Sequence, residues 1–282
     1  MKIDFNNDWN YKNEGIWQQV SLPHDAMIDS PRRKDAAGGG ACAYFDGGIY
    51  EYEKKFSVPA EWADKTAWLE CGGVYRNAKV YINDRLTGEW AYGYSEFAVT
   101  LDGFLDYGKE NTVRVVADNS KLPNSRWYTG GGIYRSVFLV VKNKTHIVRH
   151  GLTVNTLSIS PAKIRVRTDC RGGELKLSVF DGETCVAVAG GTDTEITVPN
   201  AKLWSDETPH LYSLKAELFE NGELADEEEV SFGIRSIAWS KEGFFVNGKS
   251  VLLRGGCVHH DNGILGARAY AEAEERKVRI IK

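Results

Sequence analysis

The sequence lacks the features that mark several large classes of protein. No run approaches the ~20 apolar residues that a membrane-spanning helix needs, which excludes a helical membrane protein. The five cysteines are an odd number at wide spacings, and no CxxC pair occurs. We therefore expect neither a disulfide framework nor a structural zinc site, and interpret the cysteines as small buried thiols.

A basic surface is missing as well. Lys and Arg total 35 against 39 Asp and Glu, the formal net charge is −4, and the positive residues are scattered. Nucleic acids and anionic membranes are bound through clustered positive charge, so neither is expected as a partner. The chain begins with MKIDF and shows no signal-peptide apolar core, which predicts a cytoplasmic protein.

What is present is a long series of alternating strands. In residues 50–58 the even positions are apolar and the odd positions polar, with Lys54 as the one break. The same alternation recurs in residues 78–82, 113–117 and 133–141, between turns rich in Gly, Asn and Asp. Residues 1–141 are therefore predicted to form a two-sheet sandwich of jelly-roll type.

A second segment, residues 142–239, has the same period. Its strands are marked by apolar residues within 164–166, 175–179, 196–198 and 212–218, and are divided by Gly-Gly and Asn-Gly turns. About a hundred residues of such strands indicate an immunoglobulin-like β-sandwich.

The third segment, residues 240–282, changes character. Val251, Leu252 and Leu253 form a continuous apolar run, which suits a strand covered on both faces of a parallel sheet. Residues 267–282 are rich in Ala, Glu, Lys and Arg and are predicted to be helical. One strand and one helix cannot bury their own apolar surface, whereas a (β/α)₈ barrel needs roughly 250 residues. The predicted fold class is thus all-β, two sandwiches followed by a short β/α remnant of a TIM barrel that leans on the sandwiches or frays.

Six stretches, in their order along the chain, resemble one enzyme family. They are residues 22–26 (LPHDA), 47–56 (GGIYEYEKKF), 126–135 (RWYTGGGIYR), 203–212 (LWSDETPHLY), 232–235 (FGIR) and 243–249 (GFFVNGK). The chain resembles the N-terminal portion of a glycoside hydrolase of family 2, of the β-galactosidase-like branch. That resemblance implies a sugar-binding jelly roll, an immunoglobulin-like domain and then a catalytic barrel.

The resemblance also implies a chemistry. Retaining glycosidases use two carboxylates about 5 to 5.5 Å apart, and in this family both are glutamates on later barrel strands. We therefore expect no catalytic residue in this chain, and we expect the chain alone to have no hydrolytic activity. Glu272, Glu274 and Glu275 are interpreted as a solvated helix face. No cofactor is implied.

The implied whole protein is an exo-glycosidase that removes terminal β-galactose, with β-glucuronide or β-mannoside as alternative substrates. Its partner would be carbohydrate, and members of the family often form homo-oligomers. A second hypothesis is a stand-alone carbohydrate-binding or scaffold protein without hydrolase activity. A strand and helix with unpaired edges favour the enzyme, because a binding protein gains nothing from them.

Two groups of residues are predicted to contribute to the sugar pocket. His259, His260 and Asp261 follow the Val251 strand at its C-terminal end, where barrel active sites lie, and can hydrogen-bond sugar hydroxyls. Structural hydrogen bonding and a metal site are the alternatives, although neighbouring side chains on an extended strand point apart.

The other group is Arg126, Trp127 and Tyr128. The resemblance places their loop at the barrel mouth, where an aromatic face can stack on a sugar and a guanidinium can bind hydroxyls or carboxylates. Packing against the barrel wall is the alternative. Gly130–Gly132 are interpreted as a tight turn, since no helix follows to form a phosphate site. Structural roles are expected for Arg135, as a buried ion pair, and for His24-Asp25.

Overall fold

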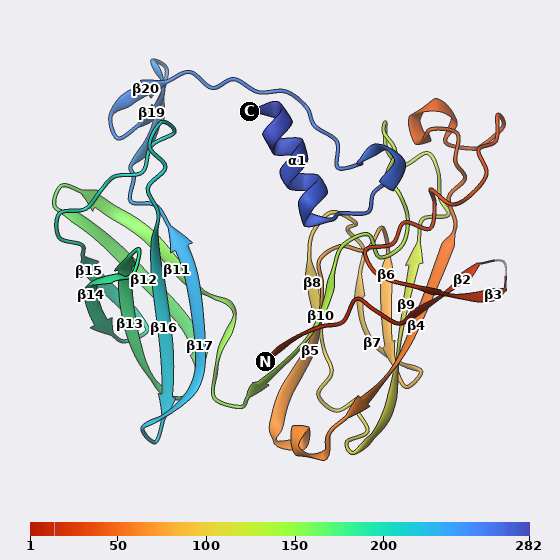
Figure 1. Cartoon of the computed structure of the whole chain (residues 1–282), viewed down its shortest axis with the longest axis horizontal. Coiled ribbons are helices and arrows are strands. Elements are labelled where there is room, and N and C mark those ends of the chain that lie inside the picture. The colour runs from red at the N-terminus through yellow and green to blue at the C-terminus, as the bar shows by residue number, and fades with distance from the viewer. Residues whose placement is uncertain (14) are drawn as a thin grey trace. The chain divides into compact units, whose positions relative to one another are not determined.

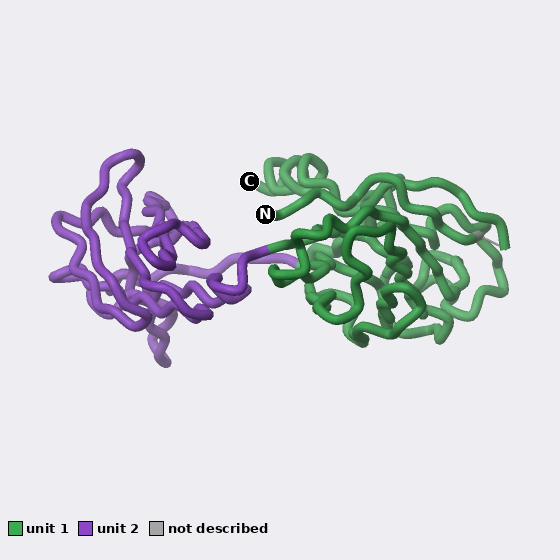
Figure 2. Tube along the Cα trace, turned by 90° about the horizontal axis from the view of Figure 1, so that it is seen from below, with its two compact units in different colours: residues 1–141, 257–282 green, residues 142–256 purple. Residues whose placement is uncertain are grey.

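A computed structural model describes residues 1–13 and 15–282 (Figure 1). The chain divides into two compact units: Met1–Val141 with Cys257–Lys282 form unit 1, and Lys142–Gly256 form unit 2 (Figure 2). The first stretch of unit 1 ends at the residue where the predicted first segment ends. The predicted third segment is not a unit of its own, because its residues up to 256 group with unit 2 and the rest with unit 1. Its assignment to a barrel stays a prediction.

Unit 1 contains a four-stranded and a six-stranded antiparallel sheet. The smaller sheet has the order β1 (Lys2–Asp4), β10 (Val137–Asn143), β5 (Lys65–Cys71), β8 (Phe97–Thr100). The larger has the order β3 (Ile16–Val20), β2 (Trp9–Asn13), β4 (Ile49–Val58), β9 (Lys109–Asp118), β6 (Ala78–Ile82), β7 (Arg85–Trp90). Two short 3₁₀ helices, η1 (Gly39–Cys42) and η2 (Ala60–Asp64), lie in the connections.

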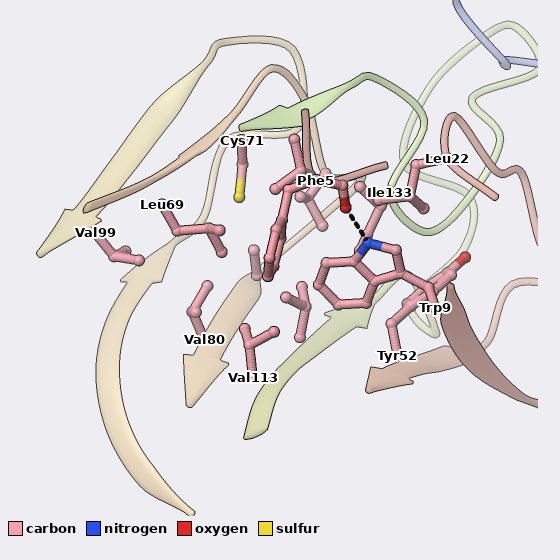
Figure 3. Packing of buried hydrophobic residues seen from close by; sticks show 14 of the residues in the cluster. Phe5, Trp9, Leu22, Tyr52, Leu69, Cys71, Val80, Val99, Val113 and Ile133 are labelled. Carbon is pink, nitrogen blue, oxygen red and sulfur yellow. Dashed lines mark hydrogen bonds between the residues drawn. The ribbon is translucent and has the colours of Figure 1, made fainter. Parts of the chain in front are cut away.

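The core of unit 1 is formed by the facing sides of these two sheets. Val80 and Val113 come from the larger sheet, and Leu69 and Val99 come from the smaller one (Figure 3). Trp9 is buried among them and donates its indole N–H to the carbonyl oxygen of Phe5 over 2.7 Å. A buried indole needs such a partner, because an unpaired N–H in an apolar core is costly.

The break in the alternation at Lys54 has a structural reason. Its ammonium group lies 4.1 Å from the ring centre of Phe5 and donates to the carbonyl oxygens of Asn7, over 2.7 Å, and Phe5, over 3.3 Å. Among the apolar positions of the same strand, Tyr52 and Val58 are buried as predicted, and Phe56 is partly buried against the same core. Lys54 can therefore occupy an inward position because its charge is met by carbonyls and an aromatic face.

Unit 2 also has two facing antiparallel sheets. One has the order β11 (His146–Ile159), β12 (Ala162–Arg171), β15 (Asp193–Thr197), and the other β14 (Thr184–Gly190), β13 (Glu174–Asp181), β16 (Tyr212–Glu220), β17 (Glu223–Phe232). Ile164 and Val166 from the first sheet share one core with Leu177 and Leu214 from the second. The prediction of an all-β chain with two sandwiches is confirmed; the jelly-roll and immunoglobulin-like types stay predictions.

The strand predicted at residues 251–253 is wrong in its extent and pairing. The structure has a small antiparallel sheet of β18 (Ile237–Ser240), β19 (Gly243–Val246) and β20 (Lys249–Val251). Val251 closes β20, whereas Leu252 and Leu253 lie beyond it and are 75% and 69% exposed. In the part of the chain that the structure describes, Leu252 and Leu253 thus lie outside any strand, and their place in a covered strand of a barrel stays a prediction.

The last stretch of unit 1 contains a 3₁₀ turn, η3 (Gly263–Leu265), and the helix α1 (Ala271–Ile281). The helix confirms the prediction for residues 267–282 but begins four residues later, after Ala267 to Tyr270 have packed against the sandwich. Ion pairs Glu274–Lys277 (3.2 Å) and Glu275–Arg279 (2.6 Å) lie along it, as expected of a solvated face. Within the described ranges, no helix is long and apolar enough to span a membrane.

Candidate functional site

The loop that carries Arg126, Trp127 and Tyr128 joins β9 to β10 and is held by the side-chain amides of the buried Asn119 and the partly buried Asn124. Asn119 donates to the carbonyl oxygen of Gly130 over 3.0 Å, and its own Oδ1 accepts from the amide of Asn124 over 2.7 Å. These bonds hold both ends of the loop. The glycines beyond it do not form the predicted tight turn, and Gly132 instead makes an isolated antiparallel bridge with Tyr75. Glycine is needed there because Gly132 has φ +101° and a Cβ would lie 2.0 Å from the hydroxyl of Tyr52.

Trp127 lies at the partly exposed centre of the loop. Its side chain is 37% exposed, and its indole N–H donates to the hydroxyl of Tyr94 over 3.0 Å. The ring of His259 lies 4.9 Å from it, centre to centre, tilted by 50°. The structure thus brings together one residue from each predicted group, although they are far apart in the chain.

Tyr128 points away from Trp127 and into the protein. Its hydroxyl donates to Oδ2 of Asp25 over 2.7 Å, and its ring packs edge-on against Phe45. Burial, together with the Asp25 carboxylate, raises the pKa of the Tyr128 hydroxyl, which therefore remains a donor. Arg126 is exposed, so its guanidinium is free to meet solvent or a ligand.

His259 and His260 point in different directions, as expected for adjacent residues in an extended segment, although they do not lie in a strand. His259 is exposed and faces Trp127. His260 is half-buried, its Nε2 donates to the carbonyl oxygen of Thr129 over 3.0 Å, and its ring meets the edges of Tyr94 and Tyr134. Burial lowers the pKa of His260, so the neutral ring is favoured.

Tyr94 is the residue that the sequence did not reveal. It contacts Trp127, His260 and also Tyr75, whose ring centre lies 5.0 Å away. Burial raises the pKa of its hydroxyl. The closely spaced aromatics in residues 91–97 (AYGYSEF) are a signal of a surface aromatic patch, but nothing in the spacing shows that this loop lies beside residue 127. We call Tyr94, Trp127, His259 and His260 the aromatic cluster.

Arg135 corrects another prediction. It was expected to be buried in a structural ion pair, but it is exposed, and its guanidinium lies 5.5 Å from the ring centre of Tyr134. Residues 133–136 do not continue the strand, which begins at Val137, so the alternation that placed Arg135 inward fails here. With Tyr134, His260 and Glu274 it lines a hollow of about 410 Å³ beside the aromatic cluster.

The aromatic cluster carries groups that can bind a polar ring. It offers aromatic faces and edges, the exposed imidazole of His259 and an exposed guanidinium nearby at Arg126, while Asp261 adds a half-buried carboxylate. The N–H of His260 is already donated to the carbonyl oxygen of Thr129. No group of three or more His, Cys, Asp or Glu in residues 1–13 and 15–282 is arranged to hold a metal ion.

Comparisons with known proteins agree on one family. The family model described as Glycosyl hydrolases family 2 matches residues 139–235. A beta-galactosidase of Bacteroides ovatus is 33% identical over 100% of this chain and 37% of its own length. A beta-glucuronidase of Bacteroides fragilis is 28% identical over 99% of this chain and 44% of its own length.

A solved structure agrees over nearly the whole chain. The crystal structure of a glycosyl hydrolase family 2 member from Bacteroides cellulosilyticus superimposes with a TM-score of 0.89 and 33% identity, and covers 99% of this chain and 41% of that one. The chain thus spans less than half the length of each of these three proteins.

Proposed function

Since this chain corresponds to the N-terminal portion of family 2 glycosyl hydrolases, we propose that it is the non-catalytic part of a retaining exo-glycosidase. In this proposal the whole protein removes terminal β-galactose from a carbohydrate. The catalytic glutamate pair comes from a barrel outside these 282 residues. The chain supports that barrel and supplies loops to the sugar pocket.

The juxtaposition of Trp127 and His259 carries the proposal. An indole face and an imidazole lie 4.9 Å apart, both partly open to solvent and both from segments that the resemblance places at the pocket. Sugars are bound by such pairs, because their C–H faces pack on aromatic rings while their hydroxyls accept and donate hydrogen bonds. Arg126, Asp261 and His260 complete the proposed pocket wall. The predicted pocket residue Tyr128 instead supports the loop from within, through its hydrogen bond to Asp25.

A β-glucuronide is the second candidate substrate. One of the relatives is named a beta-glucuronidase, and the exposed guanidinium of Arg126 suits the carboxylate that distinguishes a glucuronide from a galactoside. A β-mannoside is the third, and no side chain described above favours it.

Aryl β-galactoside, β-glucuronide and β-mannoside tested on the product of the complete reading frame would decide between these substrates. We expect the galactoside to have the largest kcat/KM and the 282-residue chain alone to hydrolyse none. A reading frame that ends at codon 282 would instead favour a stand-alone carbohydrate-binding protein. The chain alone should bind galactose weakly, and a clear calorimetric signal at low millimolar concentration would contradict the proposal.

A further inference from the structure

Asp25 is a buried carboxylate that accepts four hydrogen bonds from three separate parts of unit 1. It is fully buried. Its Oδ1 accepts from the backbone N–H groups of Gly131, over 3.0 Å, and Met27, over 3.1 Å. Its Oδ2 accepts from the hydroxyl of Tyr128, over 2.7 Å, and from the N–H of Ala267, over 2.8 Å.

These donors come from the segments that flank the aromatic cluster. Tyr128 follows Trp127 directly, and Ala267 lies in the same C-terminal stretch as His259 and His260. The link from Ala267 back to the histidines is short and ordered: Asn262 donates its N–H to the carbonyl oxygen of Gly266 over 2.8 Å, which closes the turn around η3. One carboxylate is therefore bonded to both sides of the cluster.

The residues around Asp25 also bind the C-terminal stretch. Arg268 binds both oxygens of Asp29 at 3.0 Å, and the hydroxyl of Tyr270 donates to the carbonyl oxygen of Pro23 over 3.4 Å. The approach is close, because a Cβ on Gly266 would lie 2.3 Å from Oδ2 of Asp25. Residues 23–29 and 266–270 are thus joined by a set of polar contacts, and Asp25 lies at the centre of this set.

We propose that Asp25 is a positioning residue that sets the Trp127–His259 contact by tying Tyr128 and Ala267 to one carboxylate. The inference depends on the proposed function only in treating that contact as part of a sugar pocket. Only a carboxylate fits, since two oxygens that each accept two bonds meet four donors. An asparagine would turn an N–H₂ group toward one pair of donors and lose both bonds.

The test uses the full chain without sugar. In the Asp25→Asn variant we expect loss of the nuclear Overhauser cross-peak between the rings of Trp127 and His259, assigned through a Trp127→Phe variant. The indole N–H signal of Trp9, bonded to Phe5 in the core, reports whether unit 1 is still folded. An Asp25→Asn variant with an intact core and an unchanged Trp127–His259 cross-peak overturns the inference.

Asp102 offers a matched control. Its carboxylate accepts from a backbone N–H, that of Ala67 over 2.9 Å, and from the hydroxyl of Thr66 over 2.6 Å. Asp102→Asn should leave the Trp127–His259 cross-peak unchanged, and loss of the cross-peak there too would overturn the specific role of Asp25.

If Asp25→Asn does not fold, the milder Tyr128→Phe variant tests the role of Asp25. It removes one of the four donors and keeps the carboxylate. A weakened cross-peak with the Trp9 signal intact supports the inference, and an unchanged cross-peak overturns it. The proposed function is tested separately, by the hydrolysis of aryl glycosides by the product of the complete reading frame.

Discussion

Trp127 donates its indole N–H to the hydroxyl oxygen of Tyr94 over 3.0 Å, across 33 positions of sequence. That bond fixes the orientation of a ring that is otherwise partly open to solvent. It also ties the loop between β7 and β8 to the loop between β9 and β10, so two connections of the sandwich act together at the candidate site.

A Tyr94→Phe variant should release the indole of Trp127 while leaving the ring contact with His260 in place. Because water can replace the lost acceptor at a partly exposed site, we expect a cost of about 0.5–1.5 kcal/mol in the free energy of unfolding. Urea titration measures it, and the indole N–H signal of Trp127 should shift. Tyr92→Phe, at a residue that is 62% exposed, is the control and should change neither.

A Gly266→Ala variant should destabilise unit 1 strongly. Gly266 has φ +62° and ψ −135°, a region that other residues rarely adopt, and the added Cβ would lie 2.3 Å from Oδ2 of Asp25. Gly263→Ala is a comparison in the same turn, because Gly263 has φ +59° and open space around its Cβ.

We expect about 1–2 kcal/mol of lost stability at Gly263 and more at Gly266, measured by urea unfolding. The double variant with Asp25→Ala isolates the collision, because removing the carboxylate should reduce the added cost of Gly266→Ala. Equal losses of stability in Gly263→Ala and Gly266→Ala would show that Asp25 leaves room for a side chain at residue 266.

Acidification should weaken unit 1 through His260. Burial lowers the folded-state pKa of this imidazole from its ordinary value of 6.5, against the weaker opposing effects of the hydrogen bond to Thr129 and of the carboxylates of Asp261 and Asp25. The unfolded chain then binds a proton at a higher pH than the folded chain does. Stability is therefore lost as the pH falls below about 6.5 and stops changing below the folded-state pKa.

Two measurements check this. An NMR titration of the His260 ring should give a midpoint below 6.5. His260→Gln, which can still donate to the carbonyl of Thr129, should lose less stability than the unaltered chain between neutral pH and the folded-state midpoint. His24 also has a pKa lowered by burial, so part of the pH dependence should persist in the variant. A His260 midpoint at or above 6.5 would contradict the prediction.

A Leu214→Ala variant should destabilise unit 2. Leu214 is fully buried in the centre of β16, and loss of a buried leucine side chain costs about 2–5 kcal/mol through lost burial and the cavity left behind. Leu224→Ala, in the neighbouring β17 but half exposed, is the control and should cost less than half as much. Urea unfolding followed by the Trp204 indole signal reads out this unit. Similar losses for both variants would show that the unit 2 core is loosely packed.

The strands were predictable where side-chain alternation was regular. The alternation predicts that Tyr50, Tyr52 and Val58 point inward, and all three are buried in β4. Side-chain alternation did not predict burial where the exposure of a residue depends on which element lies opposite its strand. Leu252 and Leu253 are apolar yet exposed in the part of the chain that the structure describes, and Arg135 follows a buried pair yet turns outward. Alternation specifies a face of the strand but not whether another element covers it.

The sequence pointed to some members of the candidate site but not to Tyr94, and it did not predict the geometry of the site. Imidazoles and an aromatic loop can be recognised as groups that bind sugars, and the structure places Trp127 beside His259. Tyr94 and Asp25 join the site through contacts across 33 and 242 positions, and spacing along the chain carries no information about such contacts.

The bond between Asp25 and Ala267 also imposes an order on biosynthesis. The two residues are 242 positions apart, and at about 5–20 residues per second a ribosome takes roughly 10 to 50 s to pass from one to the other. During that interval the carboxylate of Asp25 lacks the N–H of Ala267, because all of unit 2 is translated before Ala267. The Trp127–His259 contact therefore cannot gain its support from Asp25 until unit 2 has been translated.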